Sequence, residues 1–359
     1  MTATTAFLEE WLSRIEAVSS AQYSEGMRHI DGLTKPKGSL GRLEDVAARL
    51  FAVQNGCGVL AVDPARIVTV AADHGVTEEG VSASPAIVTR QQVHNFLNGG
   101  GGISVLARVN GIDHQVVDVG VAGEDFPEHP RLVRHKIASG TGNIARGPAM
   151  TEAQCLAALR LGISLAEEAH AAGFRCLGTG EMGIGNTTPS TALFAALYGL
   201  DPASIVGPGA GLSPDGIRHK TDVIRNALAV NAEAVKTGNP LTLLAALGGL
   251  EIATLTGLVL GGAALRLPVV IDGFISTAAC AVALTIAPQA GGYCFFSHAS
   301  AEPGHAVIMA KLGERPLVDL GFRLGEGSGA VFGMLILRNA AAIYNDMATF
   351  AGAGVSEGT

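Results

Sequence analysis

Helical spacing of apolar residues marks both ends of the chain. In Phe7–Val18 and Leu43–Val53, apolar side chains recur every three or four positions, as on one face of an amphipathic helix. Between them lies Leu33–Glu44, which is rich in Pro, Gly and Lys, and Ser39 within it is a candidate cap for the second helix. A further helical pattern covers Ser328–Phe350. We therefore expect helices near both termini.

In the middle of the chain the pattern changes to short apolar runs rich in β-branched residues, with helical stretches such as Glu152–Ala171 and Thr187–Tyr198 between most of them. Six runs are predicted to be strands: Arg66–Gly75, His114–Val121, Phe174–Glu181, Ser204–Gly211, Leu267–Phe274 and Tyr293–Ser300. This alternation predicts an α/β fold, in which helices cover both faces of a mostly parallel sheet. Such sheets bind ligands outside the carboxyl ends of their strands, and here those ends carry glycine and polar residues.

The same pattern suggests how the chain is divided. Residues 1–60 and 321–359 are the two helical parts, and they would pack together as a small domain. Residues 61–320 would form a large α/β domain that carries the functional site.

Composition narrows the protein class. Glycine accounts for 48 of the 359 residues, well above the usual share of about 7%. The 48% of apolar residues exclude a disordered chain, and the lack of a three-residue glycine period excludes collagen. Only 16% of residues are charged, which indicates large buried surfaces, in a covered sheet or at a subunit interface.

Charge and cysteine usage exclude further classes. The net charge is −8 and no run of basic residues occurs, so nucleic-acid binding is not expected. The five cysteines form no C-x-x-C motif, which favours reduced, buried thiols. The apolar segment Phe274–Pro288 is shorter than a membrane span and is predicted to be a buried helix. The N-terminal segment is acidic and amphipathic, unlike a signal peptide, so we expect a cytoplasmic protein.

The segment Gly178–Ser190, GTGEMGIGNTTPS, follows a predicted strand and opens a helix. Its glycines bend the backbone, and Thr187 or Thr188 is placed to cap the helix. Amide groups at a helix N-terminus bind anions, so the segment predicts a phosphate site, with an ordinary tight turn as the alternative.

A formal G-x-G-x-x-G motif, Gly178–Gly183, lies in the same segment and would suggest a dinucleotide site. The match is poor, because Asp201 is not at the end of a second strand and Glu181 would repel a pyrophosphate. Neither a P-loop nor a G-x-S-x-G motif is present.

A second candidate site is RLGEGSGA, residues Arg323–Ala330, in which Glu326 stands between two glycines before a helix. A carboxylate in an apolar site can have a raised pKa suited to removing a proton. Two interpretations stay open, a general base and an acid that stabilises a helix N-terminus.

Other glycine-rich loops are Ala138–Met150, Val206–Lys220 and Ser297–His305, and Lys220 could supply a cation to phosphate. Asn98–Ser104 is equally well explained as a turn between helices. Asp73 and His74 at a strand end are interpreted as a hydrogen-bonded pair rather than metal ligands, because no recognised metal motif accompanies them. We therefore predict no metal site.

Eight of these motifs occur in an order that resembles one family. They are LTKPKGSLGRLE, AADHGV, SPAIVTRQQV, GTGNIARGPAM, GEMGIGNTTPS, LPVVIDGF, SHASAEPGH and RLGEGSGA. From about Leu33 to the C-terminal helices, the chain is similar to the nicotinate-nucleotide–dimethylbenzimidazole phosphoribosyltransferases of cobalamin nucleotide-loop assembly. This resemblance implies a Rossmann-like sheet of about six strands, a small helical domain built from both termini, and a homodimer with sites near its interface.

The resemblance also implies a reaction and its residues. Ribose 5-phosphate would move from nicotinate mononucleotide to 5,6-dimethylbenzimidazole with inversion at C1′, without cofactor or metal. The general base matches Glu326 and a second active-site acid matches Glu181. The base-binding positions match Ser84 and Gln92, with Met182 and Leu324 as apolar walls. The positions expected at the phosphate and ribose are Gly183, Gly185, Asn186, Thr187, Lys220, Gly273 and Ser300.

Two alternatives of other classes are kept. One is an oxidoreductase that binds a dinucleotide at Gly178–Gly183, and the other is a regulatory module that binds a nucleotide without catalysis. Release of free nicotinate from nicotinate mononucleotide would separate the transferase from both.

Overall fold

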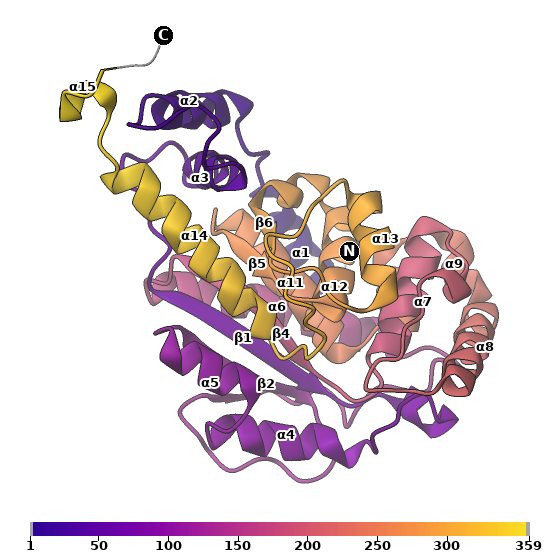
Figure 1. Ribbon diagram of the computed structural model, residues 1–359. Helices are drawn as coiled ribbons and strands as arrows, with labels where there is room; N and C mark the ends of the chain where they lie inside the picture. Colours follow the sequence, from indigo (N-terminus) through magenta and orange to yellow (C-terminus); the bar gives the residue numbers. More distant parts are fainter. Residues whose placement is uncertain (1–2, 357–359) are drawn as a thin grey trace.

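A single six-stranded sheet forms the centre of the computed structural model, which describes residues 3–356 (Figure 1). The strand order is β3-β2-β1-β4-β5-β6, and every pairing is parallel. The strands are β1 (Ala65–Ala72), β2 (Asp113–Gly120), β3 (Leu132–Arg134), β4 (Cys176–Met182), β5 (Val269–Ile271) and β6 (Cys294–Phe296). The predicted α/β class is confirmed, and the order is that of doubly wound, Rossmann-like folds.

Five of the six predicted strands are present, and one prediction is wrong. The run Ser204–Gly211 is not a strand, because Asp201 accepts a hydrogen bond from the amide of Ala203 and starts a 3-10 helix, η2 (Pro202–Ser204). The sixth strand is instead β3, a three-residue edge strand. Since its side chains are only partly buried, it carries no apolar run that the sequence could have shown.

Two groups of helices sandwich the sheet (Figure 1). One group consists of α4 (Ile87–Leu97), α5 (Gly102–Val109) and α14 (Ser328–Asp346), and the other of α6 (Glu152–Ala171), α11 (Leu250–Ala264) and α12 (Phe274–Ile286). In the second group, the backbones of α6 and α11 are in direct contact, so that a Cβ on Gly257 would collide with the carbonyl oxygen of Leu159. Close helix packing therefore explains part of the high glycine content.

The remaining helices lie around the carboxyl end of the sheet or at the termini, except η3 (Pro288–Tyr293), which directly precedes β6 at the amino end of the sheet. The others are η1 (Gly75–Glu79), α7 (Thr187–Tyr198), α8 (Pro214–Val230), α9 (Ala232–Thr237), α10 (Pro240–Leu247), α13 (Pro303–Leu312), and the terminal α1 (Ala3–Ser13), α2 (Ser20–Asp31), α3 (Arg42–Val53) and α15 (Phe350–Ala353).

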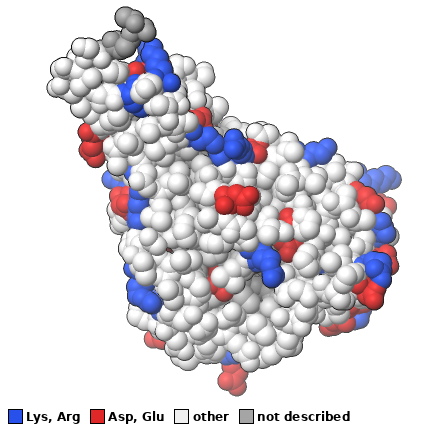
Figure 2. All heavy atoms as spheres, in the orientation of Figure 1, with Lys and Arg blue, Asp and Glu red and all other residues white. Residues whose placement is uncertain are grey.

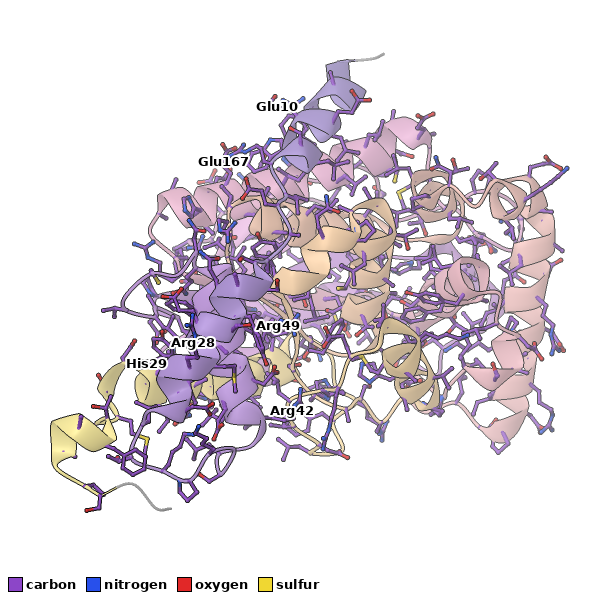
Figure 3. All side chains as sticks on the ribbon, turned by 90° about the horizontal axis from the view of Figure 1, so that it is seen from above. Glu10, Arg28, His29, Arg42, Arg49 and Glu167 are labelled. Atoms are coloured by element: carbon purple, nitrogen blue, oxygen red, sulfur yellow. The ribbon has the colours of Figure 1, made fainter. Side chains whose placement is uncertain are left out.

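The N-terminal helices divide between two places. Helices α2 and α3 pack on the far end of α14, where the ring of Tyr344 lies against Phe51 and its carbonyl is 2.9 Å from His29 Nε2. Helix α1 lies apart from them and packs on α6, and Figure 3 shows Glu10 and Glu167 on this side, away from the labelled residues of α2 and α3.

The predicted cap of α3 is wrong. Its N-cap residue is Gly41, which makes no side-chain hydrogen bond. The amide of Leu40 donates instead to Glu44 Oε1, 2.9 Å away, so an acid inside the first turn replaces Ser39.

The strongly apolar segment near residue 280 is the buried helix α12, as predicted. Among residues 3–356, no helix is both long and apolar enough to span a bilayer. Four of the five cysteines are buried, and all five are unpaired thiols. Strand order reverses between β1 and β4, which places the expected ligand site outside the carboxyl ends of these two strands.

Candidate active site

A cavity of about 320 Å³ opens beyond the carboxyl end of β4. Every site residue predicted above except Lys220 lines it, namely Ser84, Gln92, Glu181, Met182, Gly183, Gly185, Asn186, Thr187, Gly273, Ser300, Leu324 and Glu326. These residues come from distant parts of the chain, and the parallel sheet and its loops bring them to one place. The volume is in the range of pockets that bind small molecules.

The turn before α14 has an unusual backbone. Gly325, Glu326 and Gly327 all have left-handed φ angles, of 80°, 66° and 98°. For Glu326 this conformation costs roughly 1–2 kcal/mol, so contacts must hold it. Thr69 Oγ1 donates to the Glu326 carbonyl at 2.7 Å, and the Gly327 amide donates to Asp272 Oδ2 at 3.1 Å. The strained turn presents the Glu326 carboxylate to the cavity.

The Glu326 carboxylate is almost fully buried, with 4% exposed. Its Oε2 accepts a hydrogen bond of 3.1 Å from the amide of Ile103, in the first turn of α5. Burial raises the pKa of Glu326 above its ordinary value and nearby Asp272 adds to this, while the Ile103 hydrogen bond opposes it. The group is therefore a stronger base than an exposed glutamate.

The helix that follows Glu326 is capped by another acid. Asp272, directly after β5, accepts hydrogen bonds from the amides of Gly327, Gly329 and Ala330. Since Asp272 stabilises the N-terminus of α14, Glu326 does not serve that purpose there. Sequence reasoning missed Asp272, although its place at the end of a predicted strand was a signal.

Glu181 is the next-to-last residue of β4 and lies beside the Glu326 turn. Its Oε2 accepts a hydrogen bond from Asn186 Nδ2, and a Cβ on Gly325 would collide with its Oε1. Burial, supported by the charges of Asp272 and Glu251, raises the pKa of Glu181 to about 8. These surroundings therefore keep Glu181 in its protonated form at neutral pH.

Replacing Glu181 by Gln is expected to stabilise the folded protein most above pH 8. Between pH 4.5 and 8 the unfolded chain loses the Glu181 proton while the folded protein keeps it, so this contribution to stability is lost as pH rises through that window. The Gln variant has no such loss. Its advantage in unfolding free energy, measured with urea, should grow by a few kcal/mol between pH 4.5 and 8.5, because each tenfold difference in proton affinity corresponds to about 1.4 kcal/mol.

The exposed Glu128 offers a matched control, because its carboxylate is 85% accessible and pairs only with Arg134 at the surface. Glu128→Gln should leave the unfolding free energy nearly unchanged at both pH values. An advantage of Glu181→Gln that is the same at pH 4.5 and 8.5 would contradict the raised pKa.

Two helix N-termini face the other end of the cavity. Helix α7 begins after Asn186 and α12 after Gly273, and neither N-cap residue caps its own helix with a side-chain hydrogen bond. The predicted capping by Thr187 or Thr188 is therefore wrong, because Asn186 takes the N-cap position and turns its amide to Glu181. In α7 the Thr188 amide donates to the Gly185 carbonyl and Pro189 has no N–H, so the Thr187 amide remains, together with the first amides of α12, to form an anion site. Ser300 adds a side chain to this site.

Lys220 lies behind this wall rather than on it. It is 1% exposed, and its Nζ donates to Thr187 Oγ1 at 2.6 Å and to the Gly207 carbonyl at 3.3 Å. Burial lowers the pKa of Lys220 to about 8, while the neighbouring Glu302 raises it. The ammonium group thus reaches the cavity through the Thr187 hydroxyl.

The motif analysis did not single out several lining residues as site residues. They are Val81, Ser82, Val88, Ile184, Gly209, Ala210, Phe274, Ile275, His298, Glu302, Arg323 and Gly325. Four of them, Ile184, Phe274, Arg323 and Gly325, directly adjoin predicted site residues, and His298 and Glu302 belong to the flagged loop Ser297–His305. Among the described residues of this lining, Arg323 is the one Lys or Arg. Figure 2 shows charged residues scattered over one face between wide uncharged areas, in line with the low charged fraction.

The interpretation of Asp73 and His74 as a pair is wrong. His74 Nε2 lies 2.8 Å from Glu251 Oε1, and both side chains are buried. Asp73 Oδ2 accepts a hydrogen bond from the Ala122 amide instead. The partner of His74 comes from α11, which no local motif could show. Within residues 3–356, no cluster of three His, Cys, Asp or Glu side chains is placed to hold a metal ion.

Comparison with known proteins gives consistent similarities. The sequence model of a family described as phosphoribosyltransferase matches residues 15–355. Nicotinate-nucleotide–dimethylbenzimidazole phosphoribosyltransferase from Nitratidesulfovibrio vulgaris (strain DP4) is 58% identical over 350 residues, 98% of each chain. The enzyme of the same name from Oleidesulfovibrio alaskensis is 57% identical over 97% of this chain and 98% of its own. The crystal structure of CobT from Thermus thermophilus superposes with a TM-score of 0.88 at 44% identity, covering 94% of this chain and all of that one.

Proposed function

This chain belongs to the phosphoribosyltransferase family of the nicotinate-nucleotide–dimethylbenzimidazole type, and on that premise we propose its reaction. It transfers the ribose 5-phosphate of nicotinate mononucleotide to 5,6-dimethylbenzimidazole. The products are α-ribazole 5′-phosphate and nicotinate, and the first of these supplies the lower ligand of cobalamin. The chain is thus a cobalamin biosynthesis enzyme.

The nucleotide phosphate binds at the N-termini of α7 and α12. Its oxygens accept hydrogen bonds from the amides around Gly183, Gly185 and Gly273 and from the hydroxyl of Ser300. Lys220 acts on the phosphate through its hydrogen bond to the Thr187 hydroxyl. Support comes from the open first turn of α12 and from the Thr187 amide of α7, since Gly273 and Thr187 both line the cavity.

The benzimidazole binds at the apolar end of the cavity, near α4. Met182 and Leu324 contact its ring, and Ser84 and Gln92 contribute polar atoms at its edge. This placement brings the imidazole N–H toward Glu326, since Leu324 and Glu326 belong to the same turn.

Bond exchange then takes place at ribose C1′. One imidazole nitrogen forms the new C1′–N bond with its lone pair, and the N–H of the other nitrogen gives its proton to Glu326. The bond from C1′ to nicotinate breaks, and its electron pair neutralises the pyridinium, so the leaving group needs no proton. Attack from the face opposite the leaving group inverts C1′ and gives the α product.

Glu181 stabilises the positive charge that develops on the sugar. The bound pyridinium lowers the pKa of Glu181 from about 8, so the carboxyl group loses its proton when the nucleotide binds. A carboxylate beside C1′ then favours the oxocarbenium-like transition state. The chemistry described needs neither a metal nor a cofactor.

Further expectations on location, assembly, partners and domains belong to the same proposal. The enzyme is a cytoplasmic homodimer with its sites near the subunit interface, and it does not act on nucleic acid or membranes. Its small domain comprises residues 1–60 and 321–359, and residues 61–320 form the large domain. The packing of α2 and α3 on α14 supports a small domain built from both termini, whereas α1 packs on α6 and α14 also packs on the sheet.

The observation that carries the proposal is the position of Glu326, a buried carboxylate on a strained turn at the wall of a cavity onto which the N-termini of α7 and α12 also open. Incubation with nicotinate mononucleotide and dimethylbenzimidazole should release equal amounts of nicotinate and ribazole phosphate, measured by chromatography. Omitting dimethylbenzimidazole should abolish the release of nicotinate. No release, together with tight binding of NAD, would support a dinucleotide enzyme instead.

A further inference from the structure

A path of buried hydrogen bonds joins two walls of the phosphate end. The Ser300 amide donates to His305 Nδ1 at 3.2 Å, and His305 Nε2 lies 3.3 Å from Thr277 Oγ1. Thr277 Oγ1 lies 2.8 Å from the carbonyl oxygen of Gly273. His305 and Thr277 are 1% and 0% exposed, and neither lines the cavity.

The direction of every bond in this path follows from its ends. An amide can only donate, so His305 Nδ1 must be an acceptor and the ring proton must lie on Nε2. Nε2 then donates to Thr277, whose own hydroxyl proton goes to the Gly273 carbonyl, which can only accept. The path therefore requires a neutral His305 in one tautomer.

The surroundings of His305 keep it in that state. Burial, together with the stacked ring of His298 at 6.4 Å, lowers the pKa of His305 to about 4. At neutral pH the ring is uncharged, and Nδ1 remains available as an acceptor.

The path also determines which hydrogen-bonding groups of Ser300 remain free to bind a ligand. Its amide is committed to His305, and its Oγ accepts a hydrogen bond of 3.3 Å from the amide of Glu302. The hydroxyl proton is left to point into the cavity, where Ser300 is part of the wall. At the other end, the Gly273 carbonyl accepts hydrogen bonds from both the amide and the hydroxyl of Thr277, at 2.9 and 2.8 Å, and the first amides of α12 have no side-chain cap.

We propose that His305 and Thr277 are positioning residues that hold the Ser300 hydroxyl and the N-terminus of α12 at the spacing of a single phosphate group. This proposal rests on the proposed function, which puts the nucleotide phosphate between Ser300 and Gly273. Neither positioning residue touches the substrate, and both act through the two wall residues.

Thr277→Val tests the path, because valine keeps the volume of threonine and removes the hydroxyl. The KM for nicotinate mononucleotide should rise roughly 5–10-fold, the loss expected for breaking a buried hydrogen-bond link. The KM for dimethylbenzimidazole and kcat should change less than twofold, since the far end of the cavity is untouched. The inhibition constant of inorganic phosphate, used as a competitive inhibitor, should rise by the same factor as the KM for the nucleotide.

Four further variants make the test specific. Thr277→Ser keeps the hydroxyl and should restore the KM. His305→Asn keeps an acceptor for the Ser300 amide and should raise the KM less than His305→Ala does. Thr285→Val lies on the same helix and removes a similar hydroxyl, bonded to the Ala281 carbonyl without a histidine partner, and should leave the KM unchanged.

The outcomes separate this inference from the proposed function. If the wild-type protein releases no nicotinate, the reaction is wrong, and inorganic phosphate binding to wild type and Thr277→Val, measured by calorimetry, still tests the path. An equal nucleotide KM in Thr277→Val and Thr285→Val, or equal losses in kcat and in both KM values, would overturn the positioning role. If Thr277→Val does not fold, as judged by circular dichroism, the comparison of His305→Asn with His305→Ala decides.

Discussion

Glu326→Gln should lower kcat roughly 10²–10⁴-fold, the range expected for the loss of a positioned general base. Glutamine has nearly the same shape, and its side-chain oxygen can still accept the hydrogen bond from the Ile103 amide. The strained turn and the cavity wall should therefore persist, while the group that takes the imidazole proton is lost. Steady-state rates of nicotinate release measure the effect.

The pH profile gives a second result for the same variant. Only ionised Glu326 can accept a proton, and its pKa is raised by burial, so kcat/KM should rise with pH through a value above 4.5. This acid limb should disappear in Glu326→Gln. The exposed surface variant Glu128→Gln should have the same pH profile as the wild type. A loss of activity below about threefold for Glu326→Gln would argue against Glu326 as the general base.

Lys220→Met should raise the KM for nicotinate mononucleotide about 10–100-fold, with a smaller change in kcat. Methionine replaces the buried stem, while the ammonium hydrogen bonds to Thr187 and Gly207 are lost. Hydrogen bonds to charged groups contribute about 1.5–3 kcal/mol, which corresponds to this change in KM. The phosphate has the same charge before and during bond exchange, so its binding contributes equally to ground state and transition state.

Kinetics over pH distinguish this role from a general loss of structure. Since the pKa of Lys220 is lowered to about 8, the wild-type KM should rise above that pH, and Lys220→Met should show no such rise. Lys236→Met, at the exposed end of α9, is the matched control and should leave the KM unchanged. A fall in kcat larger than the rise in KM would show that Lys220 acts mainly in the transition state.

The parts of the site predicted from sequence are those that depend on local chain geometry. Glycines on both sides of Glu326 marked this segment as a candidate site, and all three residues have positive φ. The glycines after Glu181 likewise signalled the bend that opens α7. A short motif contains this information, because each backbone conformation depends on its own residue and its neighbours.

The parts that could not be predicted are the long-range partners. The amide that holds Glu326 belongs to Ile103, and the acid beside His74 belongs to Glu251. These pairs are 223 and 177 residues apart in sequence, and they meet only because the sheet order places their elements together. The position of Lys220 behind the wall has the same cause, since α8 packs behind α7.

The fold shows the same division. Long buried strands such as β1 and β4 carry apolar runs that the sequence displays, whereas the edge strand β3 has only two partly buried residues and one exposed residue. The false strand Ser204–Gly211 contains apolar residues because it packs under α13, where Gly304 contacts the carbonyl of Ile205. An apolar run shows that a segment is buried, and the Asp201–Pro202 turn decided its conformation.

A crystal structure with nicotinate mononucleotide and dimethylbenzimidazole bound to Glu326→Gln tests the account most directly, because the slow variant should hold both substrates. The phosphate should lie at the N-termini of α7 and α12, within hydrogen-bond distance of Ser300 Oγ. The imidazole N–H should point at the side chain of residue 326, with the other ring nitrogen facing C1′ opposite nicotinate. A benzimidazole whose N–H points away from residue 326, or a phosphate bound elsewhere, would contradict the account.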